Sequence, residues 1–178
     1  RCSYCNNCRY VAMLGRNPVR FHSVERVIGE LEATLGRLDF FRIVGFGDDD
    51  FFMRPRREIA EFAEQYRKRI GLPFGVAVSA NTYHREKMEM LLEGGLRFIQ
   101  MGVQSGSQRV IDEVYQRGIR VDKTRRVVSH IASCQKTHPL DFLLDFIVDN
   151  PYETPADIIE FYHYIVDPPL QMKINIFL

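Results

Sequence analysis

Five apolar, strand-like segments alternate with helix-like segments along this chain, and the alternation limits the folds open to it. Because helical sequence separates each strand from the next, consecutive strands must run in the same direction. A doubly wound sheet and a (β/α) barrel both satisfy this requirement, and both gather their chemistry at the carboxyl ends of the strands. The expected strands are residues 40–46, 74–79, 97–103, 142–148 and 172–178.

The helical segments carry start and stop signals. Ser23 is expected to cap a helix whose first turn contains Glu25. Thr154 at a cap, Pro155 at the first helical position and Asp157 in the first turn predict a second such start. The other expected helices run from about Pro55 to Gly71, from before Met88 to Gly94, from Ser107 to Arg117, and from Asp122 to about Gln135.

Composition excludes several classes of protein. The chain is 46% hydrophobic and 26% charged, as in an ordinary globular domain. A net charge of +1 gives no electrostatic reason to expect nucleic acid or an anionic membrane as a partner. No apolar run approaches the ~20 residues of a membrane span. Four cysteines in 178 residues, three of them crowded together, are not a secreted disulfide framework, so we expect a cytoplasmic protein.

The three crowded cysteines, Cys2, Cys5 and Cys8, stand at equal intervals, and Cys134 lies far downstream. A C-x2-C pair suits a metal ion, an iron–sulfur cluster or a redox dithiol, because the short loop brings both sulfurs to one point. A structural zinc site needs about four ligands, and no second close pair stands nearby. A redox dithiol would follow a strand, and no strand precedes Cys2. Both alternatives are therefore weaker than a cluster.

Cys2-Ser3-Tyr4-Cys5 resembles the second half of the CxxxCxΦC signature of radical S-adenosylmethionine (SAM) enzymes. The signature's first cysteine would lie four positions before Cys2, outside this chain, and Cys8 departs from the family pattern. The segment 145–154, together with Ser79-Ala80-Asn81, is similar to the cobalamin-binding branch. Further stretches that resemble motifs of this family, in the family's order, are residues 19–28, 48–51, 102–107 and 113–117.

The resemblance implies an α/β fold, a partial parallel (β/α) barrel. It implies that residues 1–178 are a fragment of the radical SAM core domain, starting inside the cluster-binding motif, lacking the first strand and ending at about the sixth. It also implies an enzyme whose [4Fe-4S] cluster reductively cleaves SAM to methionine and a 5′-deoxyadenosyl radical. Cobalamin, bound mainly by a domain outside this chain, would then support methyl transfer to an unreactive carbon.

The family pattern assigns roles to individual residues. Cys2 and Cys5 are expected to bind the cluster, and Tyr4 to pack against the adenine of SAM. The carboxylate of Asp48 is expected to bind the amino group of SAM, and the guanidinium of Arg117 is expected to bind its carboxylate. The side chains of Gln104 and Ser105 are expected to hydrogen-bond to the ribose hydroxyls. The other cofactor-binding residues expected are Ser79, Asn81, Asp149 and Asn150, the last two on the substrate side.

The implied partners are SAM, a substrate that the sequence does not identify, and a reductant such as flavodoxin or ferredoxin. Arg117 also has a structural interpretation, as a basic residue at the end of a helix. The run Asp48 to Asp50 has another, as solvated residues at the end of a strand. Two alternatives for the whole chain are a zinc-stabilised α/β domain and a non-catalytic scaffold. A scaffold has no need for the polar turn at 104–107.

Overall fold

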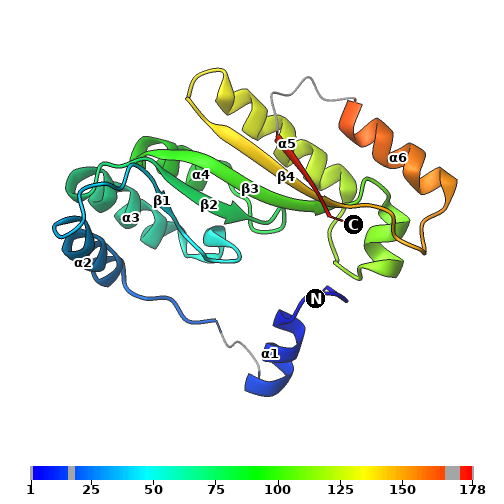
Figure 1. The fold of residues 1–178 in the computed structure, drawn as a ribbon, viewed down its shortest axis with the longest axis horizontal. Coiled ribbons are helices and arrows are strands. Elements are labelled where there is room, and N and C mark those ends of the chain that lie inside the picture. Colours follow the sequence, from blue (N-terminus) through cyan, green and yellow to red (C-terminus); the bar gives the residue numbers. More distant parts are fainter. Residues whose placement is uncertain (1, 16–18, 167–172, 178) are drawn as a thin grey trace. The chain divides into compact units, whose positions relative to one another are not determined.

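The computed structural model describes residues 2–15, 19–166 and 173–177, and the side chain of Cys8 lies outside this description. Figure 1 labels the elements along the chain. The helices and helical turns are α1 (Asn7–Leu14), α2 (Val24–Leu35), η1 (Phe51–Met53), α3 (Arg56–Arg69), α4 (Arg85–Gly94), η2 (Val110–Val114), α5 (Val121–Gln135) and α6 (Pro155–Val166). The strands are β1 (Val44–Gly45), β2 (Phe74–Val78), β3 (Leu96–Gln104), β4 (Asp141–Ile147) and β5 (Lys173–Phe177).

The described strands form one open sheet in the order β1-β2-β3-β4-β5, which is also their order along the chain. β1 and β2 pair in parallel, with Val44 opposite Phe74. β2 and β3 also pair in parallel, with Val78 opposite Met101. The prediction of a parallel α/β sheet is therefore confirmed. No helix among the described residues is long and apolar enough to cross a membrane.

The chain divides into two compact units. Unit 1 comprises residues 1–20, 102–133 and 144–178, and unit 2 comprises residues 21–101 and 134–143. Unit 1 thus holds the cysteines of the opening segment, the end of β3, η2, most of α5 and α6. Unit 2 holds α2, β1, α3, β2, α4 and most of β3.

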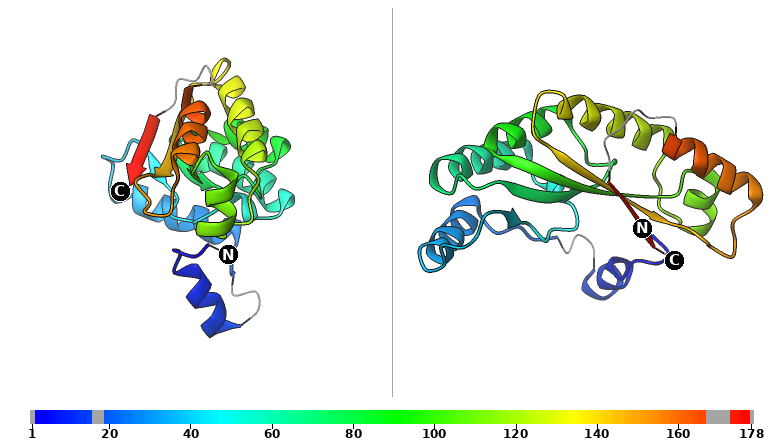
Figure 2. Two further views of the ribbon diagram at one scale, coloured as in Figure 1. Left: turned by 90° about the vertical axis from the view of Figure 1, so that its right-hand side faces the viewer. Right: turned by 45° about the horizontal axis from the view of Figure 1, so that its top comes forward.

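Unit 2 is built around an aromatic cluster. The ring of Phe46 packs edge-on against Phe62 and Phe74, with centroids 5.3 Å and 5.8 Å away. Helices α3 and α4 pack side by side (Figures 1 and 2). They approach closely because Gly94 lacks a side chain: a Cβ there would lie 3.0 Å from the Cβ of Ala63. This packing anchors β2, whose Phe74, Val76 and Val78 are buried.

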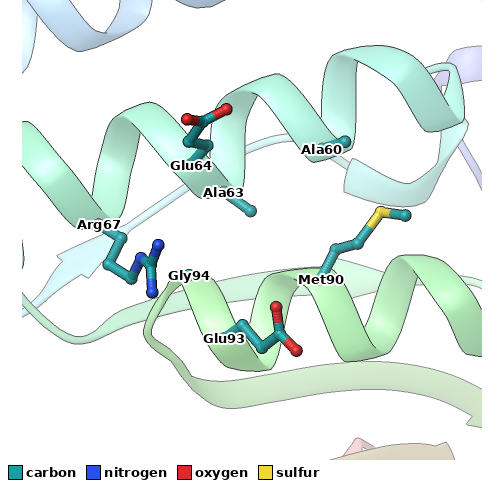
Figure 3. Close-up of a pocket in the computed structure, with 7 residues that line it drawn as sticks. All are labelled: Ala60, Ala63, Glu64, Arg67, Met90, Glu93 and Gly94. Carbon is teal, nitrogen blue, oxygen red and sulfur yellow. The ribbon is translucent and has the colours of Figure 1, made fainter.

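A hollow of about 200 Å³ lies between α3 and α4 (Figure 3). Its lining includes the small residues Ala60, Ala63 and Gly94, and the charged residues Glu64, Arg67 and Glu93. None of the residues predicted to bind a cofactor lines it, so the hollow belongs to the helical layer. Its lining residues are Ala60, Ala63, Glu64, Arg67, Met90, Glu93 and Gly94.

In unit 1, α6 packs against α5 and β4. The hydroxyl of the buried Tyr164 donates to the Thr124 hydroxyl at 3.0 Å. The Tyr164 ring also lies 5.8 Å from that of Phe146 on β4. Gly106, just after β3, approaches the backbone of α6 so closely that a Cβ would lie 2.7 Å from the Cα of Phe161. The turn after β3 is thereby clamped against α6.

Several local predictions hold. Ser23 caps α2 by accepting from the Arg26 amide at 3.3 Å. Thr154 and Asp157 form a reciprocal capping box at the start of α6, because each side chain accepts from the other residue's amide. The predicted last strand is found as β5, although its expected limits, Met172 and Leu178, lie outside the described residues.

Two predicted elements are wrong in extent. The strand expected at 40–46 is only Val44–Gly45, and Phe40 and Ile43, which precede it, are exposed. The helix expected from Ser107 to Arg117 is shorter: it ends at Val114, in the π-helical turn η2. Gln116 then takes a left-handed conformation with φ 47°, so Arg117 is not the last residue of a helix. Helix α1 and the turn η1 were not predicted.

Candidate functional site

The cysteine loop of unit 1, residues 2–5, is a tight turn. The Cys5 amide donates to the Cys2 carbonyl at 3.2 Å, and both side chains are half-buried. The Asn7 amide points at the Cys5 sulfur from 3.4 Å. Amide donors to sulfur stabilise thiolates and are a standard feature of iron–sulfur ligation. The turn therefore presents two thiols from one short loop.

Residues 110–115 hold this loop in place. The Ser3 amide donates to the Tyr115 carbonyl at 2.8 Å, and the Ser3 hydroxyl donates to the Val114 carbonyl at 2.7 Å. Carbonyls in the last turn of a helix have no intrahelical partner, so they are free to accept such bonds. The Tyr4 ring also packs edge-on against Tyr115, at 5.3 Å between centroids. The cysteine loop therefore rests on the end of η2.

The side chains of Tyr4 and Arg117 meet beside the cysteine loop. Arg117 donates from Nη1 to the Tyr4 hydroxyl at 3.4 Å. Partial burial raises the pKa of Tyr4 to about 12, and the nearby guanidinium opposes part of that rise. Tyr4 nevertheless remains half-exposed. An aromatic ring and a cation side by side suit an aromatic, anionic or zwitterionic ligand.

Gly102 on β3 provides the space in which Gln104 and Arg117 converge. A Cβ at position 102 would overlap the Gln104 amide nitrogen and would lie 3.2 Å from both terminal nitrogens of Arg117. Gln104 itself has φ 75°, in the left-handed region that non-glycine residues rarely adopt. This unusual backbone turns the Gln104 amide back over Gly102. Such strained residues concentrate at functional sites.

Ser105 and Ser107 continue the same turn and are both buried. The Ser105 hydroxyl oxygen accepts from the Ser107 amide at 3.1 Å, which leaves its proton available for another acceptor. The Ser107 hydroxyl donates to Asp157 at 2.6 Å. Arg109 and the hydroxyl of Thr154 also bond to Asp157. These bonds, above all that of Arg109, hold the pKa of the Asp157 carboxyl well below its usual range.

Asp149 and Asn150 follow β4 in unit 1. Asp149 is exposed and has φ 59°, and Asn150 is half-buried. The side-chain nitrogen Nδ2 of Asn150 donates to the Tyr115 hydroxyl at 3.2 Å, while its side-chain oxygen Oδ1 accepts from the Tyr152 backbone amide at 2.9 Å. Asn150 thus joins the end of β4 to the residue on which the cysteine loop rests.

The other predicted residues, Asp48, Ser79 and Asn81, belong to unit 2. Asp48 is half-buried after β1, and Asn81 is exposed after β2. The Ser79 hydroxyl accepts from the Asn81 amide at 3.3 Å. Asp50 next to them has a structural role, because it accepts from the Phe52 amide and from the Thr82 hydroxyl, the latter at 2.6 Å. Burial raises the pKa of Asp50 despite these bonds.

Unit 1 therefore brings together Cys2, Cys5, Tyr4, Gln104 and Arg117, with Asn150 joined to them through Tyr115. The sequence reasoning missed Ser3 and Tyr115 as parts of this arrangement, and it used Asp157 only as a helix-start signal. Ser3 stands between the two cysteines, and Tyr115 lies in a stretch that resembles a family motif, so both had a signal. No pattern in the sequence indicates that they bond to each other.

The donor set fits an iron–sulfur cluster. Two thiols lie in one turn, an amide faces one sulfur, and a cation and an aromatic ring lie alongside. Among the described residues, no three His, Cys, Asp or Glu side chains converge as a complete metal site. Cys2 and Cys5 are both reduced cysteines, so the described part of the chain presents a pair of thiols in one turn.

An open parallel sheet whose strands are connected through helices defines an α/β protein of the partial-barrel class. The model of the radical SAM superfamily matches residues 1–165. The chain belongs to this superfamily. A search of curated proteins found no match.

Solved radical SAM structures share the fold. Coproporphyrinogen III oxidase (HemN) from Escherichia coli is 12% identical with a TM-score of 0.65, over 88% of this chain and 38% of that one. The cobalamin-bound radical SAM methyltransferase TsrM from Kitasatospora setae is 14% identical with a TM-score of 0.67, over 86% and 30%. Methylornithine synthase (PylB) is 16% identical with a TM-score of 0.64, over 100% and 50%. The chain spans half or less of each of these proteins.

Proposed function

We propose that residues 1–178 are part of the core domain of a radical SAM enzyme, in which Cys2 and Cys5 supply two ligands of a [4Fe-4S] cluster. One observation carries the proposal: the hydroxyl of Tyr4, from the cysteine loop, accepts from Arg117 at 3.4 Å. The loop that would hold the cluster and a cation that could hold an amino-acid carboxylate thus lie together in one compact unit.

The residues of unit 1 divide the work of binding SAM. Arg117 would pair with its carboxylate through two parallel hydrogen bonds. Tyr4 would pack against its adenine, and Gln104 with Ser105 would bond to the ribose hydroxyls. Asp149 and Asn150 would face the substrate. The resemblance adds three further residues to the proposal: Asp48 for the amino group of SAM, and Ser79 and Asn81 as cofactor-binding residues.

When bound, the cluster and SAM supply the chemistry, an electron transfer that splits SAM into methionine and a 5′-deoxyadenosyl radical. This chain's share is to bind and orient the two groups and to exclude water. Tyr4 stands on the cysteine loop and Gln104 on the turn after β3. Each side chain keeps its position only while its turn keeps its conformation, so the hydrogen bonds that fix the two turns would help to orient SAM.

For the reaction itself we propose cobalamin-dependent methyl transfer to an unreactive carbon. The similarity of residues 145–154 to the cobalamin-binding branch supports it, and so does the shared fold with a cobalamin-bound methyltransferase. A domain outside these residues would hold most of the cobalamin. The electron would come from flavodoxin or ferredoxin in the cytoplasm. A radical reaction without cobalamin is the second candidate, because the fold is also shared with coproporphyrinogen III oxidase, a radical SAM enzyme that is not described as a methyltransferase.

Anaerobic reconstitution of the full-length protein with iron and sulfide tests the proposal. We expect a brown protein with about four irons per chain, whose electron paramagnetic resonance (EPR) spectrum changes when SAM is added. With cobalamin and reductant, methyl transfer to an unreactive carbon would yield S-adenosylhomocysteine together with 5′-deoxyadenosine and methionine, whereas a radical reaction without cobalamin would yield 5′-deoxyadenosine and methionine without S-adenosylhomocysteine. A colourless protein that takes up zinc in place of iron would contradict the proposal.

A further inference from the structure

The cysteine loop is attached to the end of η2 by two hydrogen bonds from one residue, Ser3. Ser3 stands between the two cysteines, and both of its donors are used: the amide on the Tyr115 carbonyl at 2.8 Å, the hydroxyl on the Val114 carbonyl at 2.7 Å. These bonds bridge more than a hundred positions of sequence. Because the backbone and the side chain of Ser3 are both hydrogen-bonded, the nearby residues Cys2 and Cys5 have little freedom to change their orientation.

The acceptors are the carbonyls of Val114 and Tyr115, at the carboxyl end of the π-helical turn η2. The Tyr115 amide bonds to the Val110 carbonyl, and the Arg117 amide to the Ile111 carbonyl, at 2.9 Å and 3.0 Å. Neither bond uses the carbonyl of Val114 or Tyr115, so these two oxygens point out of the turn. π-helical turns of this kind occur frequently at functional sites.

Tyr115 itself is held from the other side. Its side chain is buried, and its hydroxyl accepts from the side-chain nitrogen Nδ2 of Asn150 at 3.2 Å. Its ring supports that of Tyr4 at 5.3 Å, edge to face. One residue therefore contacts the cysteine loop through its carbonyl and its ring, and contacts the end of β4 through its hydroxyl.

We propose that Ser3 and Tyr115 are positioning residues, which hold the cysteine loop in its ligating conformation before any cluster is present. The inference rests on the proposed role of Cys2 and Cys5. It adds that the loop's geometry is set by the carbonyl end of η2 and by Asn150, and not by the cluster alone. Outer contacts of this kind orient metal ligands in many sites.

Ser3→Ala removes the hydroxyl bond and leaves the amide bond. The matched control is Ser129→Ala, because the Ser129 hydroxyl also donates to a backbone carbonyl, that of Arg125, at 2.9 Å. In the cluster-free full-length protein, we expect hydrogen exchange of residues 2–8 to be about fivefold faster in Ser3→Ala, and unchanged in Ser129→Ala. Ser3→Thr keeps the hydroxyl and would restore slow exchange.

Tyr115→Phe keeps the ring and the carbonyl but loses the bond to Asn150, so it would speed exchange of the same segment without unfolding the protein. After reconstitution, Ser3→Ala would change the EPR line shape of the reduced cluster, and Ser129→Ala would not. Unchanged exchange in both Ser3→Ala and Tyr115→Phe would overturn the inference. Because exchange is measured without cluster or SAM, a failure to bind iron would count against the proposed function and leave this result readable.

Discussion

The hydroxyl of Ser107 donates to the carboxylate of Asp157 at 2.6 Å, although the two residues are 50 positions apart. Both side chains are buried. Arg109 and Thr154 bond to the same carboxylate, so one acidic residue joins the turn after β3 to the start of α6. The turn that it fixes is the one that carries Gln104 and Ser105.

Stability should depend on the charge of Asp157. Its pKa lies below the ordinary 3.8, because Arg109 and three hydrogen-bond donors favour the ionised form. The bonds therefore stabilise the fold above pH ~4 and lose that effect as the pH falls below it. Asp157→Asn should lower the free energy of unfolding by roughly 2 kcal/mol at pH 7, and by less at pH 3.

Urea unfolding at the two pH values measures this difference. Asp122→Asn is the control, because Asp122 pairs with Arg126 on the exposed surface of α5 and should matter little at either pH. A loss at pH 3 as large as that at pH 7 would show that the charge of Asp157 is not what stabilises the turn.

Gly106 is required by the close approach of α6. In Gly106→Ala the new methyl group would meet the Phe161 backbone and the Cβ of Tyr164, both at 2.7 Å, and neither can move aside. We expect a loss of about 1 to 3 kcal/mol in unfolding free energy. Gly29→Ala, in the middle of α2 with open space around it, should instead stabilise by up to about 1 kcal/mol. Denaturant unfolding compares the two variants directly.

Gly102→Ala should separate binding from folding. Here the new methyl group would meet the ends of the Gln104 and Arg117 side chains, which can swing away. Stability should change by less than about 1 kcal/mol. SAM binding, measured by calorimetry on the reconstituted protein, should nevertheless weaken about tenfold or more, because both displaced groups are proposed ligands. Wild-type affinity in this variant would remove Gln104 and Arg117 from the site.

The three cysteines of the opening segment should differ in their effect on iron. In the full-length protein, Cys2→Ala and Cys5→Ala should lose most bound iron, because each removes a proposed ligand. Cys8→Ala should keep it, since the family pattern has no ligand at that position. Iron content per chain after reconstitution decides the matter. Equal losses from Cys5→Ala and Cys8→Ala would mean that the three cysteines are themselves the site.

Arg117 and Arg126 provide a matched pair of arginines. Removing Arg117 should weaken SAM binding about tenfold or more, because the carboxylate of SAM would lose a charged partner in a partly dry site. Arg126→Ala on α5 should have little effect, since its side chain is 69% exposed and pairs with Asp122 within its own helix. Small and equal effects from both substitutions would place Arg117 outside the binding site.

Local patterns predicted much of this protein. Apolar runs and helical spacing gave the parallel sheet, and the residues at Ser23 and Thr154 marked two helix starts correctly. These features depend on neighbours within four positions, which a sequence displays directly. The run at 40–46 gave a wrong strand length, because an apolar run does not show which of its residues the fold will cover, and Phe40 is exposed.

The sequence by itself determined the family and the alternation of strands and helices, and it predicted a role for the thiol pair of Cys2 and Cys5. Only the tertiary structure decided that Ser3 bonds to the carbonyls of Val114 and Tyr115, and that Ser107 meets Asp157. The reason is physical. A hydroxyl or an amide can bond to any unpaired carbonyl or carboxylate, and which acceptor stays unpaired depends on how a distant turn is wound. The carboxyl end of η2 left the carbonyls of Val114 and Tyr115 without helical partners, and the cysteine loop bonds to them.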